Sequence, residues 1–204
     1  MGRATQQLEQ ALWAQGVQFV AGVDEAGRGA WAGPLVAACV VMPAEPRLKR
    51  IRDSKLIPEV KRGPLFVKIT ETALDWAVGI VSVEEIDLHG VHQANAEAMR
   101  RALQALTLTP NHVLADGNFG FDLKFPATWV VEGDAKSYAI ACASILAKVT
   151  RDRLMLELHE QFPQYGFDTH KGYGTARHQS ALQEYGVLPV HRRSFAPIFS
   201  LVST

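Results

Sequence analysis

The chain has 204 residues, enough for one domain, and its 48 % apolar and 21 % charged residues are ordinary for a globular protein. Its 21 Lys and Arg residues equal its 21 Asp and Glu residues, which excludes a uniformly basic nucleic-acid coat. No apolar run reaches the ~18 residues of a membrane span, and the N-terminus lacks an apolar signal core. We therefore expect a cytoplasmic protein that contacts no membrane, and we expect it to be a monomer.

Charge is unevenly distributed along the chain. Residues 47–62 hold seven basic residues and two acids, whereas residues 71–97 hold six acids and no Lys or Arg. This polarity predicts one face that meets an anion; the alternative is scattered, solvated charge. The two cysteines, Cys39 and Cys142, lie in apolar stretches and are interpreted as core residues in a reducing compartment.

Hydrophobic periodicity predicts helices that alternate with strands after an opening pair of strands. The expected helices span residues 8–13, 58–74, 83–87, 93–106, 135–161 and 177–184. The expected strands span residues 17–24, 35–42, 75–82, 112–115 and 128–131. The connection between the first two strands is short, so we expect those strands to be antiparallel neighbours. The pattern predicts a mixed sheet in an α/β layer fold, with all 204 residues in a single domain.

Acidic residues stand where three of these strands end: Asp24 with Glu25, Asp116, and Asp134. If the strands are neighbours, four carboxylates converge, and four like charges require cations or protons to neutralise them. Oxygen-only ligands favour Mg²⁺ or Mn²⁺, and two such ions about 4 Å apart can hydrolyse a phosphodiester. Taken singly, each acid could instead merely cap a loop.

The pair Asp24 and Glu25 raises a geometric difficulty. Adjacent residues of a strand point to opposite faces of the sheet, so the two carboxylates converge only if the strand ends between them. The glycines Gly27 and Gly29 that follow favour such an ending. Arg28 between them offers a planar fork for phosphate, so this loop is a candidate anion site.

Two later segments are further candidates for contact with a nucleic acid. Ser137, Ser144, Lys148 and Arg151 fall on one face of the predicted helix, where they could follow a phosphate backbone or simply be solvated. Tyr173 lies between two glycines and after a lysine, so its ring could stack on a sugar or base; the alternative is a packed loop. The seven histidines show no zinc-site spacing.

Seven motifs in this order closely resemble bacterial ribonuclease HII, the type 2 ribonuclease H. The resemblance covers residues 17–195 and rests on VDEAGRG (23–29), DSK (53–55), DGN (116–118), GDAKS (133–137), ASILAKVTRDR (143–153), HKGYGT (170–175) and HRRSF (191–195). It implies an RNase H-like core over about residues 17–161, with a five-stranded mixed sheet flanked by helices. A small helical C-terminal part follows over about residues 162–204.

The resemblance also implies an activity. Members of the family hydrolyse the RNA strand of RNA–DNA hybrids and cut at single ribonucleotides embedded in duplex DNA, leaving 3′-hydroxyl and 5′-phosphate ends. Two alternatives come from the residues alone. One is another two-metal phosphodiesterase or DNA nuclease, which would cut all-DNA duplexes. The other is a non-catalytic module that binds hybrids.

The resemblance assigns residue roles as well. Asp24 would bridge two Mg²⁺ or Mn²⁺ ions, with Asp134 on the ion that activates water and with Glu25 and Asp116 at the leaving group. The resemblance also implies substrate contacts: Gly27, Arg28 and Gly29 at the 2′-hydroxyl, Tyr173 at the RNA-to-DNA junction, and Lys55, Ser137 and Lys148 at phosphates.

Two residues depart from the family pattern. Trp31 replaces a smaller aliphatic residue, so we expect different packing after the glycine loop. Glu132 stands where a basic or neutral residue is commoner, so we expect it to weaken substrate affinity or alter metal binding. A long N-terminal domain, typical of ribonuclease HIII, is not expected, because only about 16 residues precede the first predicted strand.

Overall fold

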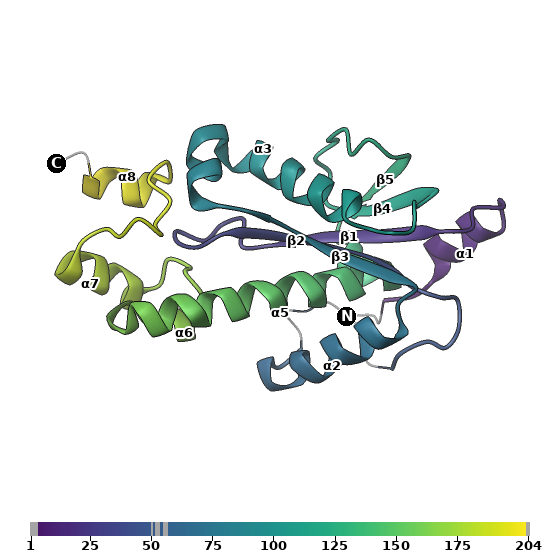
Figure 1. The fold of residues 1–204 in the computed structure, drawn as a ribbon, viewed down its shortest axis with the longest axis horizontal. Coiled ribbons are helices and arrows are strands. Elements are labelled where there is room, and N and C mark those ends of the chain that lie inside the picture. Colours follow the sequence, from purple (N-terminus) through teal and green to yellow (C-terminus); the bar gives the residue numbers. More distant parts are fainter. Residues whose placement is uncertain (1–3, 50, 52–53, 55–56, 203–204) are drawn as a thin grey trace.

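The computed structural model describes the chain except for residues 1–3, 50, 52–53, 55–56 and 203–204. Five strands form one sheet in the order β3-β2-β1-β4-β5 (Figure 1). The strands are β1 (Val20–Ala26), β2 (Leu35–Val41), β3 (Asp75–Val81), β4 (His112–Asp116) and β5 (Ala127–Val130). β1, β2 and β3 are antiparallel neighbours, whereas β4 and β5 continue the sheet parallel to β1. The predicted mixed sheet, with its antiparallel opening, is confirmed.

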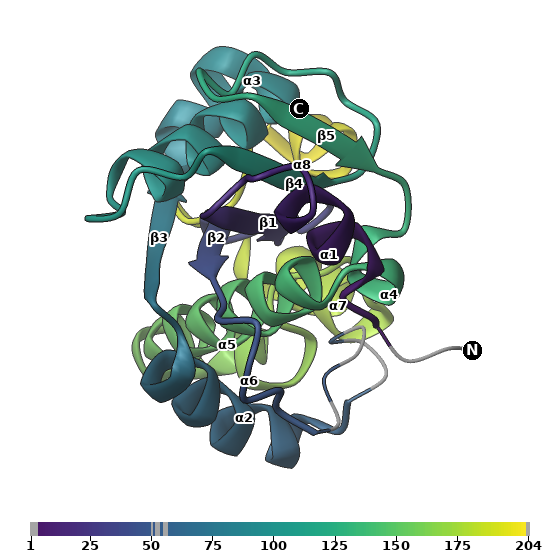
Figure 2. The ribbon, with the colours of Figure 1, turned by 90° about the vertical axis from the view of Figure 1, so that its right-hand side faces the viewer.

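Helices cover both faces of the sheet (Figure 2). They are α1 (Gln7–Trp13), α2 (Glu59–Thr72), α3 (Val83–Gln104), α4 (Gly133–Lys136), α5 (Tyr138–Gln161), α6 (Phe167–His170), α7 (Ala176–Tyr185) and α8 (Ala196–Val202). Alternate residues of β1 face opposite layers. Ala21 and Val23 pack with α3, whereas Ala26 packs with α5 and α2. All of β2 is buried, because its seven apolar residues are covered on both faces.

One helix prediction is confirmed and another is corrected by the structure. The predicted helices 83–87 and 93–106 are two helical segments of α3 that meet at a non-helical kink at Gly90 (φ 77°), and the first starts with a capping box between Ser82 and Glu85. The predicted helix 135–161 is instead divided at Ser137, whose extended backbone separates α4 from α5. Ser137 also caps α5 by accepting a hydrogen bond from the Ile140 N–H group.

The chain after α5 forms the small helical C-terminal part. A short 3₁₀ turn (Pro163–Tyr165), α6, α7 and α8 enclose their own apolar cluster, which includes Tyr165, Phe167, Leu182 and Ile198. α8 was not predicted, because its apolar residues are too few to show a helical period. Across the described residues, no helix is long and apolar enough to cross a membrane.

Candidate active site

Asp24 and Glu25 leave β1 on opposite faces, and the expectation that the strand ends between them is wrong. β1 continues to Ala26, which still pairs with Val36 of β2. Asp24 therefore faces α5, where it interacts with Ser144, and Glu25 faces the α3 layer, where it interacts with Asn95. The backbone N–H of Glu25 donates to Asp24 Oδ1 at 2.7 Å, which fixes the buried Asp24 side chain.

Asp116 brings the two faces together, because it ends β4 directly beside Asp24. The pairing of β1 with β4 ends at Val23 and Ala115, so Asp24 and Asp116 are the next residues beyond the paired part. The Asp116 carboxylate interacts electrostatically with both Asp24 and Glu25. These three carboxylates are thus within electrostatic range of one another although β1 does not end between Asp24 and Glu25.

Asp134 lies next to this group but not at the end of a strand. β5 ends at Val130, Glu132 takes a left-handed conformation (φ 54°), and Asp134 follows in α4. The Gly133 N–H donates to Asp116 Oδ1 at 2.7 Å, which ties the start of α4 to the end of β4. Asp134 is 8 % exposed. A left-handed residue other than glycine is uncommon, so Glu132 marks a constrained turn that sets where Asp134 sits.

The electrostatics of the group show the cost of burying several acids together. Burial raises the pKa of the Asp24 carboxyl well above its usual range, and the charges of Glu25 and Asp116 raise it further. Burial also raises the pKa of Glu25, although the Arg28 guanidinium, 3.4 Å from Glu25 Oε1, opposes the rise. Both acids therefore gain free energy from a cation placed among them.

Two buried side chains at this site have polar atoms without a hydrogen-bond partner. They are Glu25, through Oε2, and Asn95, through both atoms of its amide, so the interaction between these two residues falls short of hydrogen-bond geometry. Buried polar atoms of this kind are rare and call for an explanation such as a bound ion. Because the nearby donors are carboxylate and amide oxygens, the set fits a hard divalent cation such as Mg²⁺ or Mn²⁺.

The carboxylates are not gathered around a single point in this conformation. Among the described residues, no three or more His, Cys, Asp or Glu side chains are arranged as a set that could enclose a metal ion. In this arrangement Glu25 is paired with Arg28, and Asp116 accepts from the Gly133 N–H.

The glycine loop follows β1 and places Arg28 at the surface. Gly27 has a φ of +94°, and a Cβ there would lie 1.9 Å from the Arg151 Nε, so both conformation and space require glycine. The Arg28 guanidinium stacks over Phe119, 4.7 Å from the ring centroid, and its side chain is 48 % exposed. Gly29 is also exposed. The loop can thus present backbone and guanidinium groups to a ligand.

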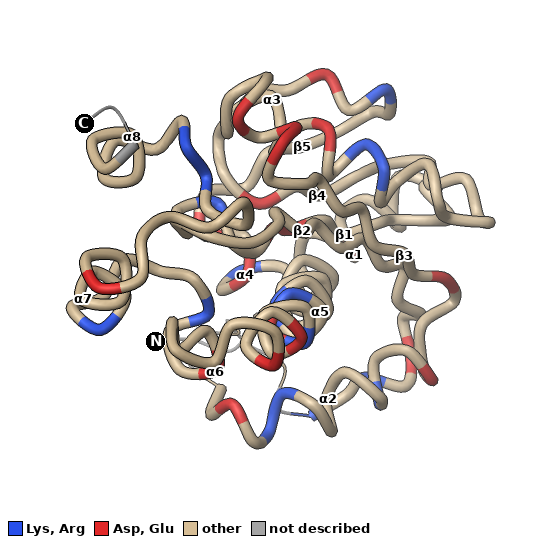
Figure 3. The backbone as a smooth tube through the Cα atoms, turned by 60° about the vertical axis from the view of Figure 1, so that its left-hand side comes forward, with Lys and Arg blue, Asp and Glu red and all other residues tan. Residues whose placement is uncertain are grey.

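The predicted Ser/Lys/Arg face of the long helix mostly points into the protein. Ser137 is fully buried and donates to Glu9 Oε1 at 2.6 Å, which is at odds with a phosphate contact by Ser137. Arg151 is also fully buried. Lys148 is half-buried and reaches Asp152 Oδ1 at 2.6 Å. Figure 3 shows both signs of charge side by side on α5. The predicted contact Lys55 lies outside the described residues.

Tyr173 lies in the loop between α6 and α7; the buried Arg151 ties this loop to the glycine loop, and the buried Arg192 ties the glycine loop to the segment before α8. The Tyr173 ring is 38 % exposed, with the Arg151 guanidinium 5.4 Å from its centroid. Arg151 donates to the carbonyls of Lys171 and Ala32, at 2.8 and 3.1 Å. Arg192 donates to the Arg28 carbonyl at 3.0 Å. The two loops, 140 residues apart in the sequence, therefore form one surface.

Sequence reasoning missed Asn95 and the structural roles of Arg151 and Arg192. Asn95 is 1 % exposed on the apolar side of α3. A polar residue among the alanines of that helix is a signal that could have identified it. Nothing in the spacing of Arg151 or Arg192 distinguishes an arginine that binds carbonyl groups from one that binds phosphate.

Comparisons with known proteins give a consistent result. The family model "Ribonuclease HII" matches residues 21–198. A ribonuclease HII of Nitrosospira multiformis is 50 % identical over 91 % of this chain and 93 % of its own length. One of Cupriavidus pinatubonensis is 50 % identical over 94 % of this chain and 89 % of its own.

A solved structure agrees with these sequence relatives. The ribonuclease H2 of Pyrococcus horikoshii superposes with a TM-score of 0.76 at 31 % identity, covering 91 % of this chain and 98 % of that one. Since the match spans the sheet, the glycine loop and the C-terminal helices alike, the fold and the activity are those of these relatives. The chain belongs to the ribonuclease HII family, the endonucleases that act on RNA–DNA hybrids.

Proposed function

We propose that Asp24, Glu25, Asp116 and Asp134 are the catalytic residues of this endonuclease and hold two divalent cations, Mg²⁺ or Mn²⁺. The observation that carries the proposal is that the buried Oε2 atom of Glu25 has no hydrogen-bond partner. The neighbouring Asp24 carboxyl has a raised pKa. A related fold supports it: a ribonuclease HIII of 15 % identity, with a TM-score of 0.70, was solved in complex with Mn²⁺. When bound, the ions would supply Lewis acidity to a water and to the leaving oxygen.

The four side chains would divide the work by position. Asp24, which touches both neighbouring acids, is suited to bridge the two ions. Asp134, carried by α4, would hold the ion on the side of the attacking water. Glu25 and Asp116 would hold the ion at the leaving group. Rotation of Glu25 away from Arg28 would complete the set and free the guanidinium for a phosphate.

The glycine loop and Tyr173 would recognise the substrate. Backbone groups of Gly27, Arg28 and Gly29 would contact the 2′-hydroxyl, the one group that distinguishes RNA from DNA at a nucleotide. The exposed ring of Tyr173 would pack at the RNA-to-DNA junction. Lys55 and Lys148 would contact phosphates. We therefore propose cleavage at single ribonucleotides in duplex DNA, with 3′-hydroxyl and 5′-phosphate products, and a role in ribonucleotide excision. The monomeric, cytoplasmic state stays a prediction.

Cleavage of labelled duplexes tests the proposal. One duplex carries a single ribonucleotide, a second is a uniform RNA–DNA hybrid, and a third is all DNA; each is incubated with Mg²⁺, Mn²⁺ or a chelator. We expect cutting of the first two only, and only with a metal ion. Cutting of the all-DNA duplex would indicate a general DNA nuclease. Binding without cutting under every condition would indicate a hybrid-binding module.

A further inference from the structure

Three imidazoles lie in contact with one another next to the Tyr173 loop. His178 and His191 are fully buried, and His170 is 7 % exposed. The His170 and His178 rings are parallel with centroids 4.5 Å apart, and the His178 and His191 centroids are 5.2 Å apart. They come from α6, α7 and the segment before α8, so they join the separate pieces of the C-terminal part.

The hydrogen bonds of His178 and His191 fix which nitrogen of each ring carries the proton. His178 Nδ1 is 3.0 Å from the Tyr173 carbonyl, which can only accept, so Nδ1 is the donor. His178 Nε2 must then accept from His191 Nε2, also at 3.0 Å. His191 Nδ1 in turn accepts from the Leu188 N–H at 2.9 Å, and the Leu188 carbonyl lies 3.3 Å from the same nitrogen. With both rings neutral, this is the arrangement in which every ring nitrogen of the relay has a partner.

The third ring holds the residue before Tyr173. His170 Nε2 donates to the Tyr165 carbonyl at 2.8 Å, and His170 Nδ1 accepts from the Gly172 N–H at 3.2 Å. Imidazoles therefore bind the Gly172 N–H group and the Tyr173 carbonyl, one on each side of the Tyr173 nitrogen. The Tyr173 ring itself remains partly exposed.

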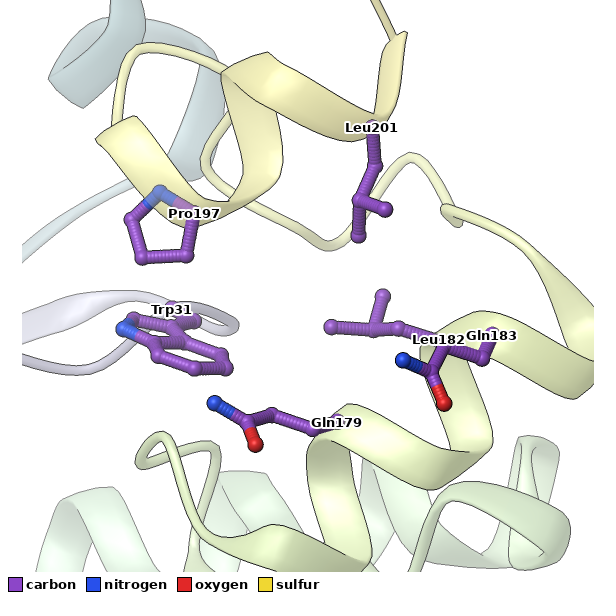
Figure 4. A pocket seen from close by; sticks show the side chains of 6 residues that line it. All are labelled: Trp31, Gln179, Leu182, Gln183, Pro197 and Leu201. Atoms are coloured by element: carbon purple, nitrogen blue, oxygen red, sulfur yellow. The ribbon is translucent and has the colours of Figure 1, made fainter.

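The glycine loop is attached to the same backbone. The N–H groups of Trp31 and Ala32 donate to the Gly172 carbonyl at 2.8 and 3.3 Å. The Trp31 ring centroid lies 5.6 Å from that of His178, and a Cβ on Gly174 would come within 2.1 Å of the Trp31 Cζ2. The expectation that Trp31 packs differently from the smaller residue of the family stays a prediction. Together with Gln179 and Pro197, the Trp31 indole lines a cavity (Figure 4), whose volume is about 270 Å³.

We propose that His178, supported by His191, is a positioning residue that fixes the main chain of Tyr173 relative to the glycine loop. An imidazole suits this task because it offers a donor and an acceptor on different edges of one rigid ring. The consequence is specificity: the tyrosine ring and the loop that meets the 2′-hydroxyl keep a constant spacing, so the enzyme favours a junction. The inference rests on the proposed function, since it takes Tyr173 as a substrate contact.

Two substitutions of the same residue separate the bonds of the relay. His178→Asn keeps a donor near the place of Nδ1, within reach of the Tyr173 carbonyl. His178→Gln keeps a polar group near the place of Nε2, within reach of His191, but leaves the Tyr173 carbonyl without its donor. The readout is the ratio of the cleavage rate on a single-ribonucleotide duplex to the rate on a uniform hybrid.

We expect His178→Asn to keep this ratio within about twofold of the parent and His178→Gln to lower it about fivefold, the effect of one hydrogen bond. Leu182→Ala is the matched control, because Leu182 is buried on α7 without touching the Tyr173 carbonyl. It should lower the melting temperature and leave the ratio unchanged. Equal ratios for the two His178 variants would overturn the inference.

A measurement on the parent protein does not depend on any variant folding. In ¹⁵N NMR spectra at pH 7.5 we expect neutral rings, with the proton on Nδ1 of His178 and on Nε2 of His191. The opposite tautomers, or a charged ring, would overturn the inference. Failure of the proposed function has a different signature: Tyr173→Ala would then leave the substrate ratio of the parent unchanged, whatever the His178 variants do.

Discussion

The carboxylate group and the histidine relay are both clusters of buried polar side chains, but they differ in how their atoms are satisfied. Every nitrogen of His178 and His191 has a partner, and the proton positions are mutually consistent. At the carboxylates, Glu25 Oε2 and the Asn95 amide lack partners, and like charges raise the pKa of Asp24. One cluster is complete within the chain, whereas the other would be completed by the cations that we propose for it.

The difference explains how the two clusters serve the same surface. A fully bonded network adds rigidity and holds loops in place, because breaking any bond leaves a buried group without a partner. In a group of acids, the like charges repel one another, and a bound cation offsets that repulsion. The relay therefore suits recognition of substrate shape, and the carboxylates suit chemistry. A substitution in one of the two regions therefore shows whether the other region responds.

The largest effect is expected from Asp24→Asn. Because this side chain would bridge both ions, the cleavage rate should fall by 10³-fold or more, while duplex affinity stays within a few-fold of the parent. The variant should also melt a few degrees higher in a chelator at neutral pH, because it removes a buried charge whose pKa is raised on folding. Rates come from single-turnover cleavage, and melting temperatures from calorimetry.

Asp122→Asn is the matched control for this prediction. Asp122 is 67 % exposed and paired with Lys124, so its loss should change neither rate nor stability measurably. Turnover by Asp24→Asn within tenfold of the parent would remove Asp24 from the catalytic group. An intact junction preference in any residual activity would show that the relay works independently of the carboxylates.

Tyr173→Ala should have the next largest effect, on recognition rather than chemistry. Stacking of an aromatic ring on a nucleotide contributes ~1–3 kcal/mol, so cleavage at a single ribonucleotide should fall about 10- to 100-fold. The loss on a uniform hybrid should be smaller, because there the next sugar carries a 2′-hydroxyl that crowds the ring. Stabilisation by Mn²⁺ in a thermal melt should stay that of the parent.

Rates on both substrates, measured in the same buffer, check this prediction. Equal losses on the two substrates would mean that Tyr173 supports the fold or general binding. Tyr173→Phe serves as the control: it retains the ring over Arg151, so it should keep most of the preference.

Acidification should weaken the relay before it affects the rest of the C-terminal part. Burial lowers the pKa of His178 and of His191 to about 4; His170 lowers both pKa values further, and His178 lowers that of His191. An unfolded imidazole binds a proton near pH 6.5, at about its ordinary pKa. Between pH 6.5 and 4 the unfolded chain therefore binds more protons, so stability falls as the pH is lowered and is constant above that window.

We expect a loss of about 2 kcal/mol at pH 4.5, or a fall of ~4–8 °C in melting temperature. Asp24 and Glu25 act in the opposite direction, because their raised pKa values favour the folded state as the pH falls. The test is thus a comparison: His178→Gln should show a shallower dependence on pH than the parent, and Asp24→Asn a steeper one. Identical curves for parent and His178→Gln would show that the relay does not titrate in this range.

The order of elements could be predicted from the sequence, because buried strands leave strong local patterns, and the acids near strand ends could be selected as candidates. The positions of Asp24 and Glu25 on opposite faces of β1 could not. They depend on β1 continuing to Ala26, beyond its pairing with β4 at Val23 and Ala115, a tertiary feature with no sequence period. The break at Ser137 was likewise hidden, since residues 135–161 have uniform helix propensity and the break is made by its hydrogen bonds with Glu9 and Ile140.

In the C-terminal part, the sequence indicated a motif but not the hydrogen-bond partners of its residues. The motif 170–175 was identified, yet the partners of His170 come from Tyr165 and Gly172, and those of His178 from Tyr173 and His191. Such bonds join residues whose spacing carries no regular pattern. A buried histidine and a catalytic one look the same in a sequence, and only the satisfaction of both ring nitrogens distinguishes them.

The smallest expected effect concerns Lys148, which lies between the two regions on α5. Its Nζ is 2.6 Å from Asp152 Oδ1, and Asp152 is also 3.5 Å from Arg62 of α2. If Lys148 contacts a phosphate, Lys148→Ala should lower the slope of log affinity against log salt concentration by about one. Duplex binding is measured from ~50 to ~300 mM salt with Asp24→Asn protein, with and without Lys148→Ala, so that cleavage does not disturb the slope.

Lys124→Ala provides the matched control, since Lys124 is exposed and also paired with an acid, Asp122. Its slope should equal that of the parent. The pairing with Asp152 makes the Lys148 result informative in both directions. A slope lowered by one means that the lysine leaves Asp152 when DNA binds, and Arg62 then remains to neutralise that acid. An unchanged slope means that Lys148 stays with Asp152, and that the phosphate contacts of this surface belong to the glycine loop and to the basic segment 47–62.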